Sequence, residues 1–431
     1  MNADRRSFLK QTSLISGAAV LTWPVPSLLA SPPGDTLRLG VIGCQRGRAV
    51  AKDFKEVGAK IVSVCDTDEA RMDKLRKEVE AEKAVPDLRR ILDDKSIDAV
   101  VIATPDHWHA PIAILACQTG KHVYVEKPCS HNIREGRLMI EAARRSGRVM
   151  QVGSQSRSTT PIREVIQLLR EGAVGEILAA KAWNSQLRRN IGHEKPCEPP
   201  AGFDYDMWVG PAPMRPFRAN CHHGTWRWWY DFGAGDIGND GIHELDIAVW
   251  GLGVETHPEV ISGHGSKTFF DDDQEFPDTQ YVTYQFPAAP GAKPKLLIYE
   301  QRIWSPYVQE GHENGDAFYG TKGYLILGKE NGWALYGPKN RLIREEKCKY
   351  STIEHAQDFI DAVRSGRRPN ADIEVGHRSA TLCHLANILT RTGHGSLRFD
   401  PKTEKFSNDT QADALLHRTY REGHWAVPRE A

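Results

Sequence analysis

Lys127 stands where a lysine is unusual, at the end of a stretch that should lie in a protein core. The stretch GKHVYVEKPCSHN runs from residue 120 to residue 132, and its apolar centre, residues 123–125, is typical of a buried strand. Lysine is seldom fully buried without a partner, so Lys127 is either ion-paired with Glu126 at the surface or held in a polar site. A desolvated lysine loses basicity, and it can then move a proton or stabilise an oxyanion.

A second titratable group, His243, lies in the stretch GNDGIHELD, residues 238–246. Histidine has an ordinary pKa close to neutrality, which makes His243 a candidate general base. The alternative is a hydrogen-bonded histidine at the start of a helix. Oxidation of a secondary alcohol needs a base for the hydroxyl proton and a donor for the developing oxyanion, and Lys127 and His243 fit these two tasks.

A candidate nucleotide-binding loop follows the first predicted strand, residues 37–43. The dinucleotide fingerprint is G-x-G-x-x-G between a strand and a helix. Gly43 takes its first position, Gln45 and Arg48 replace the other two glycines, and Gly47 lies one place early. The loop alone is therefore a weak signal. Backbone N–H groups of Gln45 and Arg46, at a helix N-terminus, are nevertheless expected to bind a pyrophosphate.

Asp66 strengthens the nucleotide interpretation, because it ends the second predicted strand 66 − 43 = 23 residues after Gly43. An acid at this place accepts hydrogen bonds from the ribose of NAD and repels the extra phosphate of NADP. NAD is therefore the predicted cofactor and NADP is less favoured. The alternative role of Asp66 is to cap the helix that follows.

The stretch IATPDHWH ends the third predicted strand at the same edge of the sheet. Ligands bind at the carboxyl ends of such strands, so Thr104, Pro105, His107 and His109 are candidates to line the nicotinamide side. The H-x-H pair could also suggest a metal site. No third ligand lies nearby in the sequence, so no metal is expected.

Alternating patterns predict the elements that position these residues. Five apolar stretches between residues 36 and 156 read as buried strands separated by helices, which predicts a parallel sheet covered on both faces. Further strands typical of an antiparallel sheet are predicted at residues 176–186, 259–269, 279–286, 295–303, 315–328 and 333–337. Helices at residues 352–366 and 374–393 are expected to return to the first domain.

The composition sets further bounds. The chain has 431 residues, formal net charge +0 and 26% charged residues, so no basic excess points to nucleic acid. No run of 18 or more apolar residues occurs, and no membrane span is expected. The eight cysteines are scattered without a C-x-x-C pair, so neither a disulfide framework nor a structural zinc site is predicted.

The N-terminus carries an export signature. Arg5 and Arg6 precede a short apolar stretch that is broken by Pro24 and Pro26. This pattern predicts a twin-arginine signal and a periplasmic or otherwise exported protein. Because that route carries folded proteins, a cofactor would be bound before export. The alternative is a basic tail on a protein that is not exported.

The motifs IATPDHWH, YVEKP, QVGSQSR, FDYDMWVGPAP and GNDGIHELD together resemble the glucose–fructose oxidoreductase / inositol dehydrogenase / MocA (Gfo/Idh/MocA) family, most closely its exported members. The resemblance covers nearly the whole chain after about residue 36. It implies an α/β protein with a Rossmann NAD(P) domain and an α+β domain that has a large, mostly antiparallel open sheet. It also implies sugar or cyclitol substrates. An exposed sheet face favours a homodimer or homotetramer.

The resulting domain prediction has four parts: residues 1–33 (export signal and linker), 36–156 (Rossmann domain), 157–350 (substrate and oligomerisation domain) and 351–431 (C-terminal helices and tail). The resemblance assigns catalysis to Lys127 and His243. The family often has an acid four residues before this histidine, where the chain has Asn239, with Asp240 next to it. Asn239 can orient a hydroxyl group but cannot take its proton.

The binding residues are predicted from their places at strand ends and in the aromatic loop 222–236. Cofactor contacts are predicted at Gly43, Gln45, Arg46, Asp66, Thr104, Pro105, His107, His109, Glu126, Lys127, Gln155 and Trp208. Substrate contacts are predicted at Arg157, Trp183, Asn184, Trp226, Arg227, Asp240 and His243. The alternative for the aromatic loop is a hydrophobic clamp between the domains.

Three functions remain open from the sequence. The first is an NAD(P)-dependent oxidoreductase that removes a hydride from a secondary hydroxyl of a sugar, glycoside or cyclitol. The second keeps NAD permanently bound and recycles it in each turnover, as a redox-neutral glycoside hydrolase or a sugar–sugar oxidoreductase, which would suit a compartment without soluble NAD. The third is a sugar-binding protein without catalysis, which the retention of Lys127 and His243 argues against.

Overall fold

The structure is a computed structural model that describes residues 36–428, except residues 289–290, 292 and 329–330. The predicted export signal, with Arg5 and Arg6, lies outside the described residues, and so does the linker up to residue 33. From residue 36 onward the described chain belongs to one compact unit. No described helix combines the length and the apolar character needed to cross a membrane.

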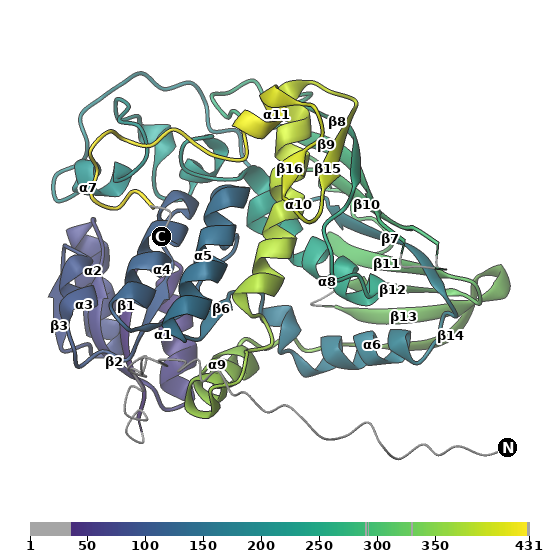
Figure 1. Ribbon diagram of the computed structural model, residues 1–431, viewed down its shortest axis with the longest axis horizontal. Coiled ribbons are helices and arrows are strands. Elements are labelled where there is room, and N and C mark those ends of the chain that lie inside the picture. Colours follow the sequence, from purple (N-terminus) through teal and green to yellow (C-terminus); the bar gives the residue numbers. More distant parts are fainter. Residues whose placement is uncertain (1–35, 289–290, 292, 329–330, 429–431) are drawn as a thin grey trace, which may run out of the picture. The chain divides into compact units, whose positions relative to one another are not determined.

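The first sheet is parallel throughout and contains six strands in the order β3-β2-β1-β4-β5-β6 (Figure 1). The strands are β1 (Arg38–Ile42), β2 (Lys60–Cys65), β3 (Lys83–Val85), β4 (Ala99–Ile102), β5 (His122–Val125) and β6 (Met150–Val152). The order reverses at β1, which is the doubly wound arrangement of a Rossmann domain. The sequence predicted five of these strands. It did not predict β3, a three-residue edge strand with no buried side chain to create an apolar run.

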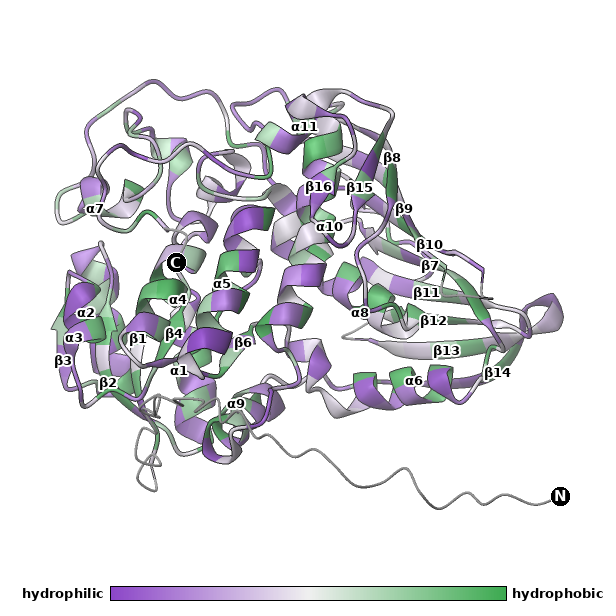
Figure 2. Ribbon diagram, in the orientation of Figure 1, coloured by the Kyte–Doolittle hydropathy of each residue, from purple (hydrophilic) through white to green (hydrophobic). Residues whose placement is uncertain are grey.

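Helices cover both faces of this sheet. They are α1 (Gly47–Glu56), α2 (Glu69–Val79), α3 (Arg89–Asp93), α4 (Asp106–Gln118), α5 (Ile133–Ser146) and α9 (Ile353–Ser365). Helix α9, from the C-terminal part of the chain, packs on α1, where Phe359 and Phe54 have ring centroids 5.5 Å apart. Figure 2 shows mixed hydrophilic and hydrophobic residues along α2 and α5, whereas α4 is largely hydrophobic. Burial on both faces explains why the strands read as continuous apolar runs.

The second sheet has ten strands in the order β14-β13-β12-β11-β7-β10-β9-β8-β15-β16. They are β7 (Ile177–Asn184), β8 (Val260–Ser266), β9 (Thr279–Phe286), β10 (Lys295–Arg302), β11 (Asn314–Gly320), β12 (Tyr324–Gly328), β13 (Gly332–Gly337), β14 (Arg341–Glu346), β15 (Ser396–Asp400) and β16 (Lys405–Phe406). Only the β7–β10 pairing is parallel. The predicted fold class is therefore confirmed. The predicted single strand 315–328 is two strands, β11 and β12, and the exposed strand β14 has no apolar pattern to reveal it.

Helices cover one face of the second sheet. They are α6 (Thr160–Arg170), α8 (Ile242–Leu252) and α10 (Ile373–Thr392), and the Tyr284 hydroxyl in β9 donates to the carbonyl of Leu382 in α10. The opposite face exposes Tyr281, Leu296 and Tyr319. The prediction of a homo-oligomer rests on such a face and stays a prediction.

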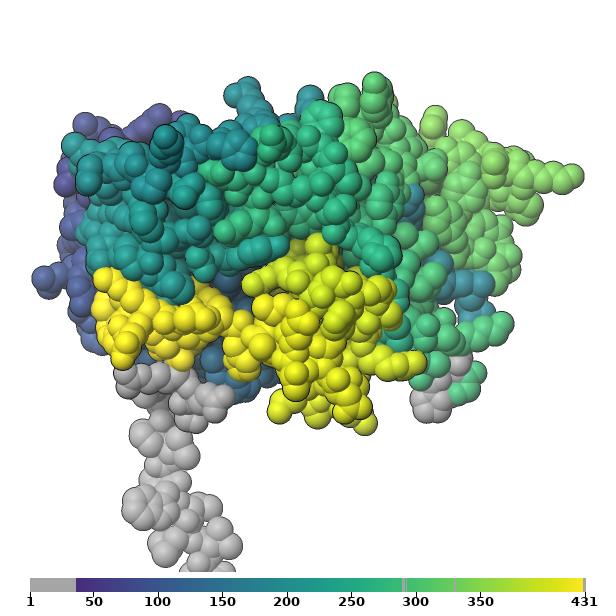
Figure 3. Space-filling view, turned by 90° about the horizontal axis from the view of Figure 1, so that it is seen from above, coloured from purple at the N-terminus to yellow at the C-terminus, as the bar shows by residue number. Residues whose placement is uncertain are grey.

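An irregular cover segment, residues 185–236, follows β7 in the sequence and contains only short helices such as α7 (Tyr205–Val209). The C-terminal tail that follows α11 (Thr410–Ala414) holds this segment and the first domain together. The Arg418 guanidinium pairs with Glu135 at 2.7 Å, and Arg421 pairs with Asp206 at 2.8 Å. Figure 3 shows the yellow C-terminal residues against the teal surface that includes the cover segment.

Candidate active site

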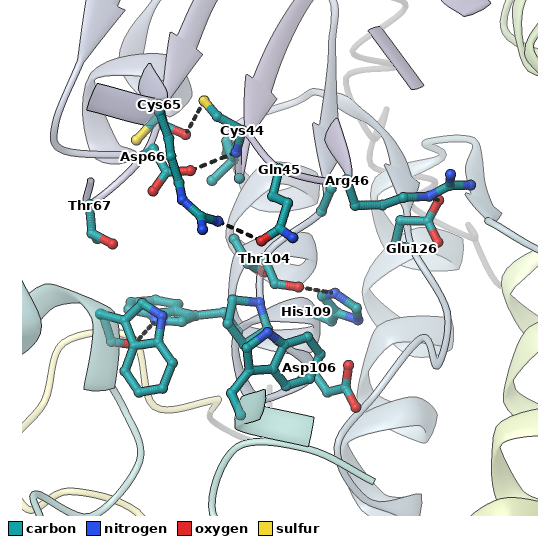
Figure 4. Close-up of a pocket in the computed structure, with 18 of the residues that line it drawn as sticks. Cys44, Gln45, Arg46, Cys65, Asp66, Thr67, Thr104, Asp106, His109 and Glu126 are labelled. Atoms are coloured by element: carbon teal, nitrogen blue, oxygen red, sulfur yellow. Dashed lines mark hydrogen bonds and ion pairs between the residues drawn. The ribbon is translucent and has the colours of Figure 1, made fainter. Parts of the chain in front are cut away.

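A cavity of about 460 Å³ opens at the carboxyl ends of β1, β2, β4 and β5, beneath the cover segment. These strand ends contribute Gly43, Asp66, Thr104 and Lys127 to its wall (Figure 4 draws part of the wall). Parallel strands bring residues that are distant in sequence to one such edge. Of the predicted residues, those that line the cavity are Gly43, Gln45, Arg46, Asp66, Thr104, Pro105, His109, Glu126, Lys127, Trp208, Trp226, Arg227 and Asn239.

Two glycines shape the nucleotide-binding loop. Gly43 has φ +93°, and a Cβ there would lie 2.4 Å from the carbonyl oxygen of Ala103. A Cβ on Gly47, the first residue of α1, would lie 2.9 Å from Val41 Cγ1. Gly47 therefore allows the close helix–strand approach that the third fingerprint glycine usually allows. Arg48 forms an ion pair with Glu78 and does not line the cavity.

The N-terminus of α1 is available to an anion. Arg46 precedes this helix and makes no side-chain cap, so it leaves backbone N–H groups of the first turn without an intrahelical acceptor. Such N–H groups bind phosphate well. The Arg46 side chain turns instead to Glu126, with Nε 3.0 Å from the carboxylate.

A Gly43→Ala variant is expected to raise the dissociation constant for NAD by at least about tenfold, because the side chain forces the loop away from Ala103. Isothermal titration calorimetry with NAD measures this change. Gly58→Ala is the matched control, since Gly58 has φ +87° but no atom within 4 Å of an added Cβ. That control should lose stability and keep its affinity for NAD. Unchanged affinity in Gly43→Ala would contradict the assignment.

Asp66 is oriented at the carboxyl end of β2 by the backbone. Its carboxylate accepts hydrogen bonds from the N–H groups of Cys44 at 2.6 Å and Asp68 at 3.0 Å. Burial raises the pKa of Asp66, and these two bonds and the charge of Arg71 oppose the rise. Arg71 also lines the cavity and bonds to Gln45, a role that the sequence did not suggest.

The cover segment closes over the corner beside Asp66. His223 Nε2 lies 2.9 Å from the Asp68 carboxylate. Two backbone hydrogen bonds join the same parts of the chain, from Glu69 N–H to the Gly202 carbonyl at 3.0 Å and from Asp204 N–H to the Thr67 carbonyl at 2.9 Å. These contacts join the cover segment to the first domain at this end of the cavity, and we call them the latch.

Lys127 lines the cavity close to Asp106, Arg227 and Asn239, and we call this part of the cavity its inner end. Its ammonium group donates to the backbone carbonyl of Asn239 and forms no ion pair with any described residue within 4.0 Å. Glu126 is paired with Arg46 instead, and its one hydrogen bond with Lys127 is to the backbone N–H of that residue, at 3.3 Å. Burial lowers the pKa of Lys127. These contacts contradict the alternative of a surface ion pair between Lys127 and Glu126.

Asp106 is an acid in the cavity that sequence reasoning missed. It is the first residue of α4, is 3% exposed, and lies at the far end of the cavity from Asp66 (Figure 4). The Ala234 N–H donates to its carboxylate, and Lys127 and Arg227 are the nearby cations. Burial raises the pKa of Asp106 against these influences. In the sequence it reads as an ordinary acid in the first turn of a helix.

Asn239 lines the cavity, and its backbone carbonyl is the acceptor for Lys127. It lies in a π-helical turn, Ile237–Gly241, and its amide donates to Asp236 at 3.4 Å and Asp240 at 3.2 Å. The Arg188 guanidinium pairs with both of these acids. The amide nitrogen is thus held by Asp236 and Asp240 and the backbone carbonyl orients Lys127, while a contact between the Asn239 side chain and a substrate hydroxyl stays a prediction.

Asn184 and Asp240 belong to the same network and do not line the cavity. Asn184 donates to Asp236 at 2.8 Å, and Asp240 is held by Arg188. Their predicted substrate contacts are thus replaced by a supporting role behind Asn239. Trp183, the neighbour of Asn184, is fully buried and donates to the His312 carbonyl. Successive strand residues point to opposite faces, so Trp183 and Asn184 could not both face the cavity.

Four more predicted residues lie outside the cavity lining. Arg157 forms a buried ion pair with Asp246 at 2.9 Å, which replaces its predicted contact with substrate. His107 is packed within the core near the Trp208 carbonyl, 3.0 Å from Nε2. Gln155 donates to the Tyr124 hydroxyl at 3.1 Å. His243, at the start of α8, is 8% exposed.

A separate cluster of potential metal ligands lies away from this cavity. His257, His377 and Glu404 bring ligand atoms within 4.8 Å of one another. Both imidazoles contact one carboxylate oxygen of Glu404, at 3.0 and 2.8 Å, and Arg137 contacts the same oxygen at 2.6 Å. The arginine makes this cluster an ion-paired network that fastens the β15–β16 turn to α10.

Comparison with known families identifies the architecture. A family described as an oxidoreductase family with an NAD-binding Rossmann fold (GFO_IDH_MocA) matches residues 37–154, and its C-terminal alpha/beta domain matches residues 179–284 and 345–427. The chain belongs to the Gfo/Idh/MocA oxidoreductase family. Its first domain is accordingly an NAD-binding Rossmann domain, as the sequence predicted.

Individual relatives resemble parts of the chain. A Glycosyl hydrolase family 109 protein from Shewanella pealeana is 30% identical over 42% of this chain and 46% of its own length. Inositol 2-dehydrogenase 2 from Saccharopolyspora erythraea is 29% identical over 51% of this chain and 55% of its own length. The chain thus spans about half the length of these curated relatives.

Solved structures share the fold over a longer stretch. A levoglucosan dehydrogenase in complex with NADH and levoglucosan aligns with a TM-score of 0.66 and 20% identity, and the alignment covers 84% of this chain and 99% of that chain. At this level of identity the likeness establishes the arrangement of the two domains. The substrate has to be argued from the residues of the cavity.

Proposed function

We propose that the protein is an NAD-dependent oxidoreductase that removes a hydride from a secondary hydroxyl of a sugar, glycoside or cyclitol. The observation that carries the proposal is Lys127, a desolvated ammonium group without a carboxylate partner at the inner end of the cavity. Such a group has the properties of an acid–base catalyst.

The residues of the outer cavity fit NAD. Asp66 lines the cavity and suits the adenosine ribose, and the first turn of α1 suits the pyrophosphate. Thr104 has a buried hydroxyl without a hydrogen-bond partner at the cavity wall, which suits the carboxamide of the nicotinamide. Bound NAD supplies the hydride acceptor. The Asp66 carboxylate favours NAD over NADP because it repels a 2′-phosphate.

The chain supplies the proton acceptor. Lys127 in its neutral form takes the proton of the substrate hydroxyl, and the Asn239 carbonyl keeps its Nζ directed into the cavity. Asp106 carries a raised pKa next to Lys127, so one proton can reside on either group. We assign acceptance of the substrate hydroxyl proton to Lys127 and Asp106 rather than to His243, because His243 does not line the cavity.

An Asp106→Asn variant is expected to shift the rising limb of the rate–pH profile to lower pH. The Asp106 charge raises the pKa of Lys127, so its removal lowers that pKa and frees the neutral amine at lower pH. Glu126, Arg227 and Arg46 are the other charges acting on Lys127. Steady-state rates from mild acid to mild alkali measure the shift. Asp93→Asn, at an exposed position of α3, should leave the profile in place, and an unmoved limb in Asp106→Asn contradicts the pairing.

The proposed activity is tested with a panel of hexoses, hexuronic acids, glycosides and inositols at saturating NAD. Reduction of the nicotinamide, followed by absorbance, is expected with at least one class. A protein that binds both NAD and a sugar but reduces no cofactor with any panel member would be a binding protein, and the oxidoreductase proposal would fail.

A redox-neutral reaction with retained NAD is the second candidate, and the latch beside Asp66 favours it. The contacts of His223 with Asp68 and of Gly202 with Glu69 close one corner of the cavity, and they are expected to slow the release of a cofactor bound beneath them. Slow release of NAD during gel filtration, and faster release in His223→Ala, are expected for this candidate. Cleavage of a glycoside without added NAD would establish it, whereas rapid exchange in the wild-type protein would exclude it.

We also propose export by the twin-arginine route, on the basis of Arg5 and Arg6. A fusion of the first 35 residues to a reporter that folds in the cytoplasm tests this directly. Export that is lost in an Arg5→Lys, Arg6→Lys double variant is expected. Equal retention of both fusions in the cytoplasm would contradict it.

A further inference from the structure

Arg227 is a cation in the cavity wall without an anionic partner. It lies in a 3-10 turn of the cover segment, Thr225–Trp228, and lines the cavity with Lys127, Trp226 and Asn239. It forms no ion pair with any described residue within 4.0 Å, and its buried Nε has no hydrogen-bond partner. Burial lowers the pKa of Arg227, which reports the cost of desolvating this unpaired charge.

The neighbouring charges leave Arg227 available to a ligand. Asp236 and Asp240 both form ion pairs with Arg188, so neither is left as an ion-pair partner for Arg227. Of the two carboxyl groups that line the cavity near Lys127, Glu126 is paired with Arg46, and Asp106 is shared electrostatically between Lys127 and Arg227. An incoming oxidised nicotinamide adds another positive charge there. An anionic group on the second ligand would balance this excess.

We propose that the sugar substrate of this site carries a carboxylate, as in a uronic acid or its glycoside, and that Arg227 binds that carboxylate. The proposal rests on the proposed oxidoreductase function and names its substrate class. A guanidinium presents parallel N–H donors that match the two oxygens of a carboxylate, and the pair is strongest where water is excluded. The Trp226 ring, 5.7 Å from the guanidinium carbon, supplies an apolar wall beside it.

The pyrophosphate of the cofactor is the competing anion for Arg227. The first turn of α1, with Arg46, is the place for a pyrophosphate, and it lies at the carboxyl end of β1. Arg227 instead has Lys127 as an electrostatic neighbour and shares Asp106 with it. The geometry therefore assigns Arg227 to the substrate rather than to the cofactor.

The test compares matched ligands that differ only in charge. Methyl β-glucuronide and methyl β-glucoside, and the corresponding galacto pair, are titrated into the full chain loaded with NAD, and their dissociation constants are measured by calorimetry. At least one uronide is expected to bind about 100-fold more tightly than its neutral partner. Equal or tighter binding of both neutral glycosides would overturn the proposal. Because binding is measured, this outcome is separate from a failure of hydride transfer.

Variants of Arg227 give the second readout. Arg227→Gln is expected to reduce the uronide-to-glucoside affinity ratio by about 100-fold. Arg227→Lys is expected to reduce it by less, because lysine keeps the positive charge but lacks the parallel N–H donors of the guanidinium. Arg215→Gln is the matched control: Arg215 lies in the same cover segment, pairs with Asp231 at 3.0 Å and does not line the cavity. An unchanged ratio in Arg227→Gln, or a loss confined to NAD affinity, would overturn the assignment.

Discussion

A Lys127→Met variant is expected to bind NAD and sugar but to transfer hydride at least about a thousandfold more slowly than the wild-type protein. Methionine fills a similar volume, so the inner end of the cavity keeps its shape. It cannot accept the hydroxyl proton, and it leaves the Asn239 carbonyl without its donor. Single-turnover reduction of bound NAD measures the loss, and calorimetry with NAD checks that the binding site survives.

Lys121→Met is the matched control for this substitution. Lys121 is also a buried lysine, immediately before β5, and its ammonium group donates to the carbonyls of Asp94 at 2.7 Å and Ile97 at 3.0 Å. It does not line the cavity. The control should lose stability and keep the hydride-transfer rate of its folded fraction. Near wild-type turnover in Lys127→Met would remove Lys127 from the mechanism.

Acidification is expected to destabilise the fold well before the carboxylates are protonated. Burial lowers the pKa of His107 to about 3 and that of His384 to about 4. Between the ordinary pKa near 6.5 and these values, the unfolded chain binds protons that the folded chain does not bind. Each histidine then removes about 1.4 kcal/mol of stability per pH unit as the pH falls through this window.

Urea unfolding at several pH values between about 7 and about 5 measures this linkage. In the wild-type protein, the free energy of unfolding should fall with decreasing pH. His384→Gln keeps a donor for the Ser130 carbonyl, which lies 3.1 Å from Nε2 in the wild-type protein, but it cannot bind a proton. Its plot of unfolding free energy against pH should therefore be shallower, by up to the contribution of one proton. Parallel slopes in the wild-type protein and His384→Gln would contradict the neutral buried state of His384.

The sequence was sufficient for features that depend on strand ends. Gly43, Asp66, Thr104 and Lys127 each follow a buried strand, and a parallel sheet brings such positions to one edge whatever the details of packing. The same logic predicted the fold class, because strands buried on both faces leave long apolar runs. The short strand β3 and the exposed strand β14 leave no such runs, and the sequence did not reveal them.

Side-chain direction in the second domain could not be predicted from the sequence. Trp183 and Asn184 both looked suited to bind a sugar, yet strand alternation sends them to opposite faces. Arg157 was predicted to contact the substrate, but it pairs with Asp246 of α8. Asp106 was overlooked because its burial depends on the cover segment, which supplies the Ala234 N–H more than 100 residues later in the chain.

The most direct test of the central claim is the redox state of the cofactor itself. The full chain is incubated with NAD and with sugars of the panel, and denatured so that the oxidised and reduced nucleotide can be assayed. Part of the NAD is expected to become NADH with at least one sugar, and no NADH is expected in Lys127→Met. A protein that binds no NAD at saturating concentration, or whose NAD stays oxidised with every sugar, would contradict the claim.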